Sequence, residues 1–335
     1  MPGVLLMTGA TGFLGRRFVR LLLDRGVAPE RLRCVVRDRP RALAAGVPAA
    51  SVHLADLGDA AAEGALAAAA AGADVVLHLA AELKGWTRSS FAAVNVAGTE
   101  RLLRAVASAA PAAHVVLVSS LAAAGPSVDG AGTALPPDRC RPVSAYGDSK
   151  RRGELLVAAG SQPWTILRPP VVYGAGDGAT RLLFRQATAP IALVPWRPRP
   201  LSVIHVDDVA RALWQAVTRR PAGAVVPLDG HERTDTTAFV RAIAAACGRR
   251  ARLVPVPIAL ASLGAWASDG WAALRRSAGY FSRDKVRELR AAGWVCDPAP
   301  ARERLDFAAS VPLADGLAAV AVAEGFARGV TSATA

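Results

Sequence analysis

Little cysteine, little lysine and no long uninterrupted apolar run characterise this chain of 335 residues. The cysteines, Cys34, Cys140, Cys247 and Cys296, are far apart and form no CxxC pair. This spacing argues against a disulfide framework or a zinc site and predicts reduced, structural thiols in a cytoplasmic protein. We therefore expect no metal and a cytoplasmic location.

The most apolar stretch, Val254 to Leu274, is interrupted by Pro255, Pro257 and Asp269. It never reaches the roughly 18 uncharged apolar residues that a membrane-spanning helix needs. We interpret it as a buried or dimer-facing helix and expect no membrane partner, with attachment to a membrane surface as the weaker alternative. The first residues have no basic region before them and are expected to form a strand, not a signal peptide.

The net charge of +13 comes almost entirely from arginine, because lysine occurs only at Lys84, Lys150 and Lys285. The arginines are spread through an alanine-rich chain, and no basic run is interleaved with aromatic residues. This pattern favours a solvated arginine-rich surface over a nucleic-acid partner. The length suits one large domain or two closely packed ones.

Short apolar runs alternate with helical patterns through the first half of the chain, which is typical of an α/β protein with a doubly wound parallel sheet. In such a sheet, ligands bind at the carboxyl ends of the strands. The strands are predicted at Val4–Met7, Leu32–Val36, Ser51–Leu54, Val75–Leu79, Val115–Ser119 and Thr165–Leu167.

A glycine-rich turn follows the first predicted strand and precedes a helix that ends near Gly26. Gly9 permits a tight turn, Gly12 lets the backbone approach phosphates, and Gly15 lets the helix pack on the strand. The N–H groups at the start of the helix then attract a pyrophosphate. The residues predicted to contact a dinucleotide here are Thr8, Gly9, Thr11, Gly12, Phe13, Leu14 and Gly15.

The end of the second strand predicts the choice of dinucleotide. Its first polar residue is Arg37, which can pair with a 2′-phosphate, so NADP(H) is preferred over NAD(H). Asp38 is the opposing signal, because a shift of one residue would favour NAD. Asp56 and Leu57 after the third strand are candidates for the adenine edge. The small side chains at the end of the fourth strand let the cofactor lie close to it. The predicted contacts there are Leu79, Ala80 and Ala81.

Three residues carry the catalytic prediction. Tyr146 and Lys150 are four apart and share one face of a predicted helix, so the lysine ammonium favours the phenolate form of the tyrosine. The same lysine can hold a nicotinamide ribose hydroxyl. Ser120 closes the fifth strand and can donate a hydrogen bond to a substrate oxygen that becomes an alkoxide.

Other polar residues near these positions have structural interpretations. We expect His78 to be a buried, hydrogen-bonded histidine and Asn95 to tie its helix to the neighbouring strand. Asp207 and Asp208 begin a predicted helix and are expected to cap its free N–H groups, in preference to binding a metal.

Together these motifs resemble the extended short-chain dehydrogenase/reductases, also called the NAD-dependent epimerase/dehydratase family. The resemblance covers nearly the whole chain. The segments that carry it are Thr8–Gly15, Asp56-Leu57, His78–Ala81, Asn95–Thr99, Ser119-Ser120, Tyr146–Lys150, Leu167–Gly174 and Ile204–Ala210.

The resemblance implies a Rossmann domain over residues 1–168 and a smaller, mixed α/β substrate part over residues 169–335, interleaved with the first. It implies a Ser-Tyr-Lys oxidoreductase, a nicotinamide cofactor, a small-molecule substrate and a homodimer packed through the helices around Asn95 and Tyr146. Further cofactor contacts are expected at Ser119, Pro169, Val171 and Val172. Substrate contacts are expected at Ser120, Lys84, Trp86, Ala122, Tyr173 and Trp196.

Within this family the sequence is most similar to the 3β-hydroxysteroid dehydrogenases and the dihydroflavonol reductases. Nucleotide-sugar enzymes usually carry an asparagine where this chain has Val171, and dehydratases carry an acidic pair where it has Leu121 and Ala122. We therefore predict hydride transfer between NAD(P)H and a hydrophobic ketone or secondary alcohol. The alternatives are a nucleotide-sugar epimerase, dehydratase or 4-ketoreductase and, less favoured, a non-catalytic dinucleotide sensor.

Overall fold

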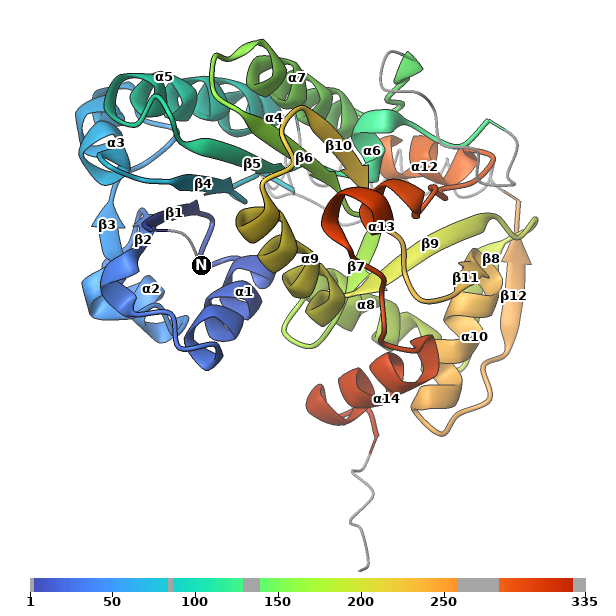
Figure 1. The fold of residues 1–335 in the computed structure, drawn as a ribbon. Coiled ribbons are helices and arrows are strands. Elements are labelled where there is room, and N and C mark those ends of the chain that lie inside the picture. The colour runs from blue at the N-terminus through green and yellow to red at the C-terminus, as the bar shows by residue number, and fades with distance from the viewer. Residues whose placement is uncertain (1–2, 84–86, 129–138, 258–282, 328–335) are drawn as a thin grey trace, which may run out of the picture.

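The computed structural model describes residues 3–83, 87–128, 139–257 and 283–327, and a parallel sheet of seven strands forms its centre (Figure 1). Every neighbouring pair in this sheet is parallel. The strand order is β3-β2-β1-β4-β5-β6-β10. The strands are β1 (Leu5–Thr8), β2 (Leu32–Val36), β3 (Val52–Leu54), β4 (Val75–His78), β5 (His114–Val118), β6 (Trp164–Arg168) and β10 (Ala224–Pro227).

Helices cover both faces of the sheet because its strands are apolar on both sides. In β1, Leu5 and Met7 belong to one core cluster and Leu6 to the other. The first cluster is closed by α1 (Phe13–Asp24), α2 (Arg39–Ala44), α9 (Val206–Arg219) and α13 (Ala299–Leu305). The second is closed by α3 (Glu63–Ala70), α5 (Thr99–Ala109) and α7 (Ala145–Ala159).

Shorter helices connect these elements. They are η1 (Pro29–Arg31), η2 (Ala49–Ser51), η3 (Ala60–Ala62), α4 (Arg88–Ala92), the π-helical η4 (Ala93–Gly98) and α6 (Leu121–Ala124).

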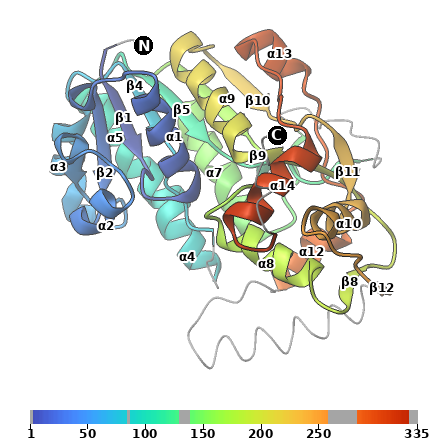
Figure 2. The same cartoon turned by 90° about the horizontal axis from the view of Figure 1, so that it is seen from below.

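The second half of the chain builds a smaller α/β part beside the carboxyl ends of the large sheet (Figure 2). Its core contains Tyr173, Phe184, Phe239 and Leu317. Its strands are β7 (Val171–Tyr173), β9 (Pro200–His205) and β11 (Arg233–Asp235) in one sheet, and β8 (Ala192–Pro195) and β12 (Leu253–Val256) in another. Its helices are α8 (Gly178–Ala187), α10 (Thr236–Ala246), α12 (Arg283–Arg290) and α14 (Leu313–Ala323).

The predicted fold class is confirmed, and all six predicted strands are present with ends that differ by at most one residue. The seventh strand, β10, comes from the second half of the chain and pairs with β6. The two halves are therefore interleaved at the large sheet.

The apolar run from Val254 to Leu274 begins as a strand, since Leu253–Val256 forms β12. The expectation of a helix was therefore wrong for Val254–Val256, because these residues form backbone hydrogen bonds with β8 as a strand. Residues 258–274 lie outside the described residues. Within the described ranges, no helix combines the length and the apolar composition needed to cross a membrane.

A buried ion pair joins α7 to the end of β6. The Arg168 guanidinium donates from Nε to Oε1 of Glu154 at 2.8 Å and from Nη2 to Oε2 at 2.7 Å. Their side chains are 2% and 0% exposed, and Arg151 adds a third donor to the carboxylate at 3.0 Å. Each charge is out of water, so each depends on the other for its stability.

Replacing one partner of this pair is expected to destabilise the fold. Glu154→Ala leaves Arg168 buried and unpaired, which should lower the free energy of unfolding by about 3–5 kcal/mol in a urea titration. Glu63→Ala is the matched control, because Glu63 pairs with Arg104 on the exposed surface and should cost about 1 kcal/mol or less. Equal losses in the two variants would contradict a structural role for the buried pair.

Candidate active site

The glycine turn after β1 is shaped by close backbone contacts. Gly9 has φ +75°, and a Cβ there would lie 2.7 Å from the Ala80 nitrogen, so only glycine brings this turn against the end of β4. A Cβ on Gly15 would collide with the carbonyl oxygen of Gly9. Gly12 is exposed, and no side chain caps the helix N–H groups that follow it. This uncapped start of α1 fits a dinucleotide pyrophosphate.

His78 is held inside the protein beneath this turn. Its Nδ1 bonds with Oγ1 of Thr8 at 2.7 Å and its Nε2 bonds with Oγ1 of Thr99 at 2.9 Å. Burial, with a smaller effect of the Lys150 charge, lowers the pKa of His78 to about 3. A permanently neutral imidazole with both nitrogens bonded supports the predicted structural role.

The polar residues at the ends of β2 and β3 have separate roles. Asp38 caps α2, because its Oδ1 accepts from the Arg41 backbone N–H at 2.9 Å. Arg37 is exposed and makes no hydrogen bond or ion pair within the described part of the chain. The Asp56 carboxylate accepts from the Gly58 N–H at 2.8 Å, and Leu57 is 7% exposed. Of the two competing residues after β2, Asp38 therefore uses one carboxylate oxygen as a helix cap, whereas Arg37 has no partner among the described residues.

Ser120 and Tyr146 meet at the carboxyl end of β5. Ser120 caps α6 by accepting from the Ala122 N–H at 3.1 Å, and its side chain is close enough to Tyr146 to lower the pKa of the phenol. Ser144 caps α7 by accepting from Gly147 at 3.0 Å. A Cβ on Gly147 would collide with the carbonyl oxygen of Ala122, so this glycine lets α7 start against α6.

Lys150 lies one turn further along α7 and is 5% exposed. Its Nζ donates to the carbonyl oxygen of Val118, the last residue of β5, at 2.8 Å. Burial lowers the pKa of Lys150 to about 8, although the charge of Glu154 opposes this change.

The protonation of Tyr146 differs from the sequence expectation. Burial raises its pKa to about 12, the Ser120 hydrogen bond lowers it, and the charge of Glu288 raises it. The phenolate form expected from the sequence is therefore not the favoured one, because the loss of water around the phenol is the largest effect. Tyr146 holds its proton at neutral pH.

Asn95 connects three parts of the site, as predicted. Its Oδ1 accepts from the Glu82 N–H at 2.7 Å, and its Nδ2 donates to the Glu82 carbonyl oxygen at 3.1 Å. The same Nδ2 donates to Oγ of Ser149 on α7 at 2.9 Å. The segment after β4, the π-helix η4 and the catalytic helix are thus held together by one amide.

The remaining predicted contacts fall in different environments. The Pro169 carbonyl oxygen accepts from the Leu121 N–H at 2.8 Å, which places Pro169 beside Ser120. Ser119 is buried, Val172 is half-buried and Val171 is 38% exposed. Ala122 is buried on α6 directly behind Ser120, and Trp196 is 64% exposed. Lys84 and Trp86 lie outside the described residues.

Tyr173 is a correction to the predicted substrate contacts. Its side chain is 2% exposed and packs edge-on against His205 and Phe239, with ring centroids 5.2 and 6.1 Å away. Gly316 of α14 lies against its hydroxyl. The apolar neighbours leave this ring no free face, so Tyr173 is a core residue of the smaller part.

The sequence analysis missed two features of the site. Glu288 comes from α12, far from Tyr146 in the sequence, and no local pattern marks it. The pair formed by Glu154 and Arg168 had a local signal, since Glu154 follows Lys150 by four residues and shares its helix face. Its partner Arg168 lies on β6, and only the tertiary structure shows that the two side chains meet.

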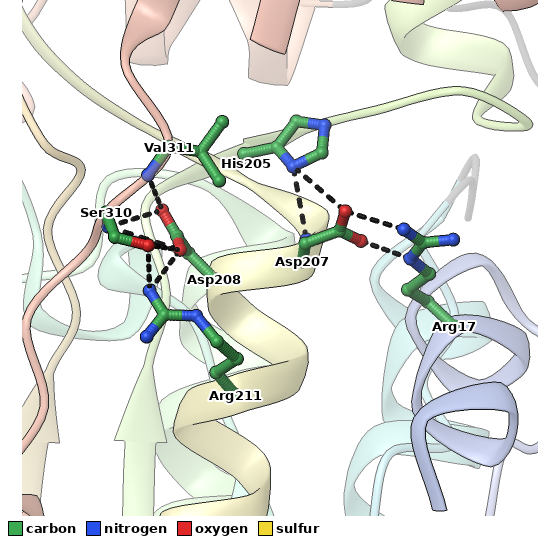
Figure 3. Close-up of polar contacts among 7 residues, drawn as sticks. All are labelled: Arg17, His205, Asp207, Asp208, Arg211, Ser310 and Val311. Atoms are coloured by element: carbon green, nitrogen blue, oxygen red, sulfur yellow. Dashed lines mark hydrogen bonds and ion pairs between the residues drawn. The ribbon is translucent and has the colours of Figure 1, made fainter. Parts of the chain in front are cut away.

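The acidic pair at the start of α9 does not cap that helix, contrary to expectation (Figure 3). His205 is the cap, because its Nδ1 accepts from the Asp207 N–H at 3.3 Å. Asp207 instead pairs with Arg17 of α1, with Arg17 Nη2 donating to Oδ2 at 2.6 Å. This ion pair therefore joins α1 to the start of α9.

Asp208 anchors the segment that leads into α14 (Figure 3). Its Oδ2 accepts from the Ser310 and Val311 N–H groups, each at 3.1 Å, and its Oδ1 pairs with Arg211. Its carboxylate is buried and saturated with donors, which makes it structural. Across the described ranges, no three His, Cys, Asp or Glu side chains gather closely enough to hold a metal.

Comparison with known proteins agrees with this fold. The model of the NAD dependent epimerase/dehydratase family matches residues 5–226. The ceramide reductase of Caulobacter vibrioides is 36% identical over 90% of this chain and 88% of its own length. The dTDP-glucose 4,6-dehydratase of Streptomyces griseus is 30% identical over 94% of this chain and 92% of its own length.

Among solved structures, MoeE5 in complex with UDP-glucuronic acid and NAD has a TM-score of 0.72 at 24% identity, covering 96% of this chain and 99% of its own. The chain belongs to the NAD dependent epimerase/dehydratase family. It is an enzyme of the extended short-chain dehydrogenase/reductase type.

Proposed function

We propose that this enzyme reduces a hydrophobic ketone with NADPH. The observation that carries the proposal is the wall directly behind Ser120. Helix α6 consists of Leu121 and three alanines, all buried, and presents no charged side chain beside the reacting oxygen. Such a wall suits an apolar substrate, because a phosphorylated sugar needs polar partners that this wall does not offer.

The relative named ceramide reductase narrows the substrate class. A ceramide is an N-acyl amino-alcohol lipid with a secondary hydroxyl group. The oxidised counterpart of that hydroxyl is a ketone, which is the group that a Ser-Tyr-Lys site reduces. We therefore propose the keto form of an N-acyl amino-alcohol lipid as the substrate.

The roles of the catalytic residues follow from their contacts. The bound nicotinamide supplies a hydride to the carbonyl carbon. Ser120 donates a hydrogen bond to the carbonyl oxygen and stabilises its growing negative charge. Tyr146, whose pKa Ser120 influences, gives its proton to that oxygen. The Lys150 ammonium, held by the Val118 carbonyl oxygen, stabilises the phenolate that this proton transfer leaves.

The protonation of Tyr146 supports the reductive direction. A phenol with a pKa of about 12 holds its proton at neutral pH and is ready to act as an acid. Oxidation of an alcohol would need the phenolate first, which burial disfavours.

The cofactor preference rests on Arg37. Its side chain is exposed at the end of β2, whereas the neighbouring Asp38 is engaged in capping α2. Arg37 would pair with a 2′-phosphate. The other residues that would hold the dinucleotide are Thr8, Gly9, Thr11, Gly12, Phe13, Leu14, Gly15, Asp56, Leu57, Leu79, Ala80, Ala81, Ser119, Tyr146, Lys150, Pro169, Val171 and Val172.

We also propose a cofactor part over residues 1–168, a substrate part over residues 169–335, and a homodimer packed through α5 and α7. Leu155 supports the dimer, because it is 51% exposed on α7, where an apolar side chain gains from a partner surface.

A nucleotide-sugar epimerase or dehydratase is the second candidate. The dTDP-glucose 4,6-dehydratase that resembles this chain favours it. Val171 opposes it, because an apolar, partly exposed side chain stands where such enzymes usually carry an asparagine.

The reaction itself is the test. With NADPH and the keto form of an N-acyl amino-alcohol lipid in detergent micelles, we expect mass spectrometry to detect the corresponding alcohol. Tyr146→Phe should reduce turnover by about 100-fold or more, because the proton donor is lost, while NADPH still binds. UDP- and dTDP-sugars should not bind in a parallel titration. Sugar-nucleotide binding without lipid reduction would make the second candidate the conclusion.

Arg37→Ala is expected to weaken NADPH binding by about 10- to 100-fold, because a charge-assisted contact to the 2′-phosphate is lost. NADH, which has no such phosphate, should bind as before, and fluorescence titration measures both. Arg31→Ala is the matched control, because Arg31 is an exposed arginine just before the opposite end of β2. Equal weakening of both cofactors by Arg37→Ala would refute the contact.

Raising the pH through about 8 should slow ketone reduction, because the pKa of Lys150 is about 8 and its ammonium is lost above that pH. Tyr146, with a pKa of about 12, does not titrate there. The measurement is kcat against pH at saturating substrate and cofactor. Lys150→Arg, which keeps its charge, should show a lower but flat profile. A wild-type rate that increases over this range would exclude the assigned role of Lys150.

A further inference from the structure

The smaller part exposes an apolar strand at the end of the molecule. Ile191 and Leu193 are 49% and 54% exposed, whereas Ala192 and Val194 between and beyond them are buried against the core. Trp196, which follows β8, is 64% exposed. Figures 1 and 2 both place β8 and β12 at the end of the molecule opposite to β2. We call Ile191, Leu193 and Trp196 the apolar rim.

The chain around the apolar rim carries charge of only one sign. Residues 178–206 and 236–257 contain eight arginines and no aspartate or glutamate. Arg181 is paired with Glu324, but Arg197, Arg250 and Arg252 are exposed. Arg252 lies beside the rim, since its carbonyl oxygen accepts from the Ala192 N–H at 3.0 Å. These two segments therefore bring only positive charge to the apolar rim.

A cleft adjoins the rim and shares Trp196 with it. It has a volume of about 390 Å³ and is lined by Pro195, Trp196, Arg197, Arg199, Pro257 and Leu289. Leu289 belongs to α12, the helix whose Glu288 influences the charge state of Tyr146. The cleft thus lies between the rim and a helix that borders the catalytic tyrosine.

We propose that the rim docks on an anionic lipid bilayer and that the cleft receives the substrate from it. The apolar side chains would enter the boundary between headgroups and acyl chains, while the arginines pair with lipid phosphates. A second copy of this chain fits the rim poorly, because two faces of the same positive charge repel each other. The substrate class rests on the proposed function, but bilayer docking does not. This proposal replaces the sequence expectation of no membrane partner.

Flotation with vesicles tests the docking. The vesicles are phosphatidylcholine alone, or phosphatidylcholine with about 30% phosphatidylglycerol. The wild type should float only with the anionic vesicles. Ile191→Ser with Leu193→Ser should weaken this binding by about tenfold or more because apolar burial is lost. Arg250→Glu with Arg252→Glu should weaken it at least as much because the attraction to lipid phosphate is reversed.

Leu54→Ser is the matched control, because Leu54 is 56% exposed on β3, at the other end of the molecule. This variant should float like the wild type. Absence of wild-type binding to anionic vesicles, or unchanged binding by the rim variants, would overturn the proposal. Concentration-dependent self-association that the rim variants abolish, without vesicle binding, would assign the rim to a second copy instead.

Two further measurements separate docking from the proposed function. Tyr146→Phe should bind vesicles like the wild type, because docking does not use the catalytic tyrosine. The variant with Ile191→Ser and Leu193→Ser should reduce a short, water-soluble ketone at the wild-type rate but lose about tenfold on vesicle-borne lipid. Vesicle binding with no reduction of any ketone would refute the reductase alone, and equal rates on vesicle-borne lipid would refute the role of the rim in substrate uptake.

Discussion

The placement of α7 on the carboxyl ends of β5 and β6 is the constraint on which the site depends. Two charged side chains of α7 are buried, and each must find a partner on those strands because an isolated charge inside the protein is costly. Lys150 reaches the Val118 carbonyl oxygen of β5, and Glu154 reaches Arg168 of β6. The helix can satisfy both groups only in one register, and that register brings Tyr146 to Ser120.

The same packing explains how the tyrosine is tuned. The buried charges of Lys150 and Glu154 hold α7 in place through their partners on the sheet. The same burial raises the pKa of Tyr146 and lowers that of Lys150. Tyr146 is therefore a neutral phenol at neutral pH, and Lys150, one turn further along α7, titrates about one pH unit above neutrality. In the proposed reduction, this arrangement provides an acid and a nearby positive charge without any movement of α7.

The smaller part adds a contrast in charge. Around the Rossmann sheet several arginines pair with acidic residues, as Arg17 does with Asp207 and Arg168 with Glu154. Around β8 and β12 the arginines have no acidic residues in their own segments. A uniform solvated arginine surface, expected from the composition, does not account for this difference, whereas a docking surface for anionic lipid does.

The sequence by itself determined the fold class, six strands of the large sheet and the placement of Tyr146 and Lys150 on one helix. These features are local, because each strand is an apolar run, the glycine turn is contiguous, and Tyr146 and Lys150 are one helical turn apart. The predicted structural role of Asn95 also followed from its place after β4, and its hydrogen bonds bear this out.

Only the tertiary structure decided which groups are paired and which are left exposed. The partners Glu154 and Arg168 lie 14 residues apart, on different elements, and Asp208 meets Ser310 and Val311 across more than 100 residues. Burial turned Tyr173 into a core residue and reversed the expected shift of Tyr146. The contacts and the solvent exposure of a side chain depend on residues that are distant in the sequence, and a local sequence pattern does not specify them.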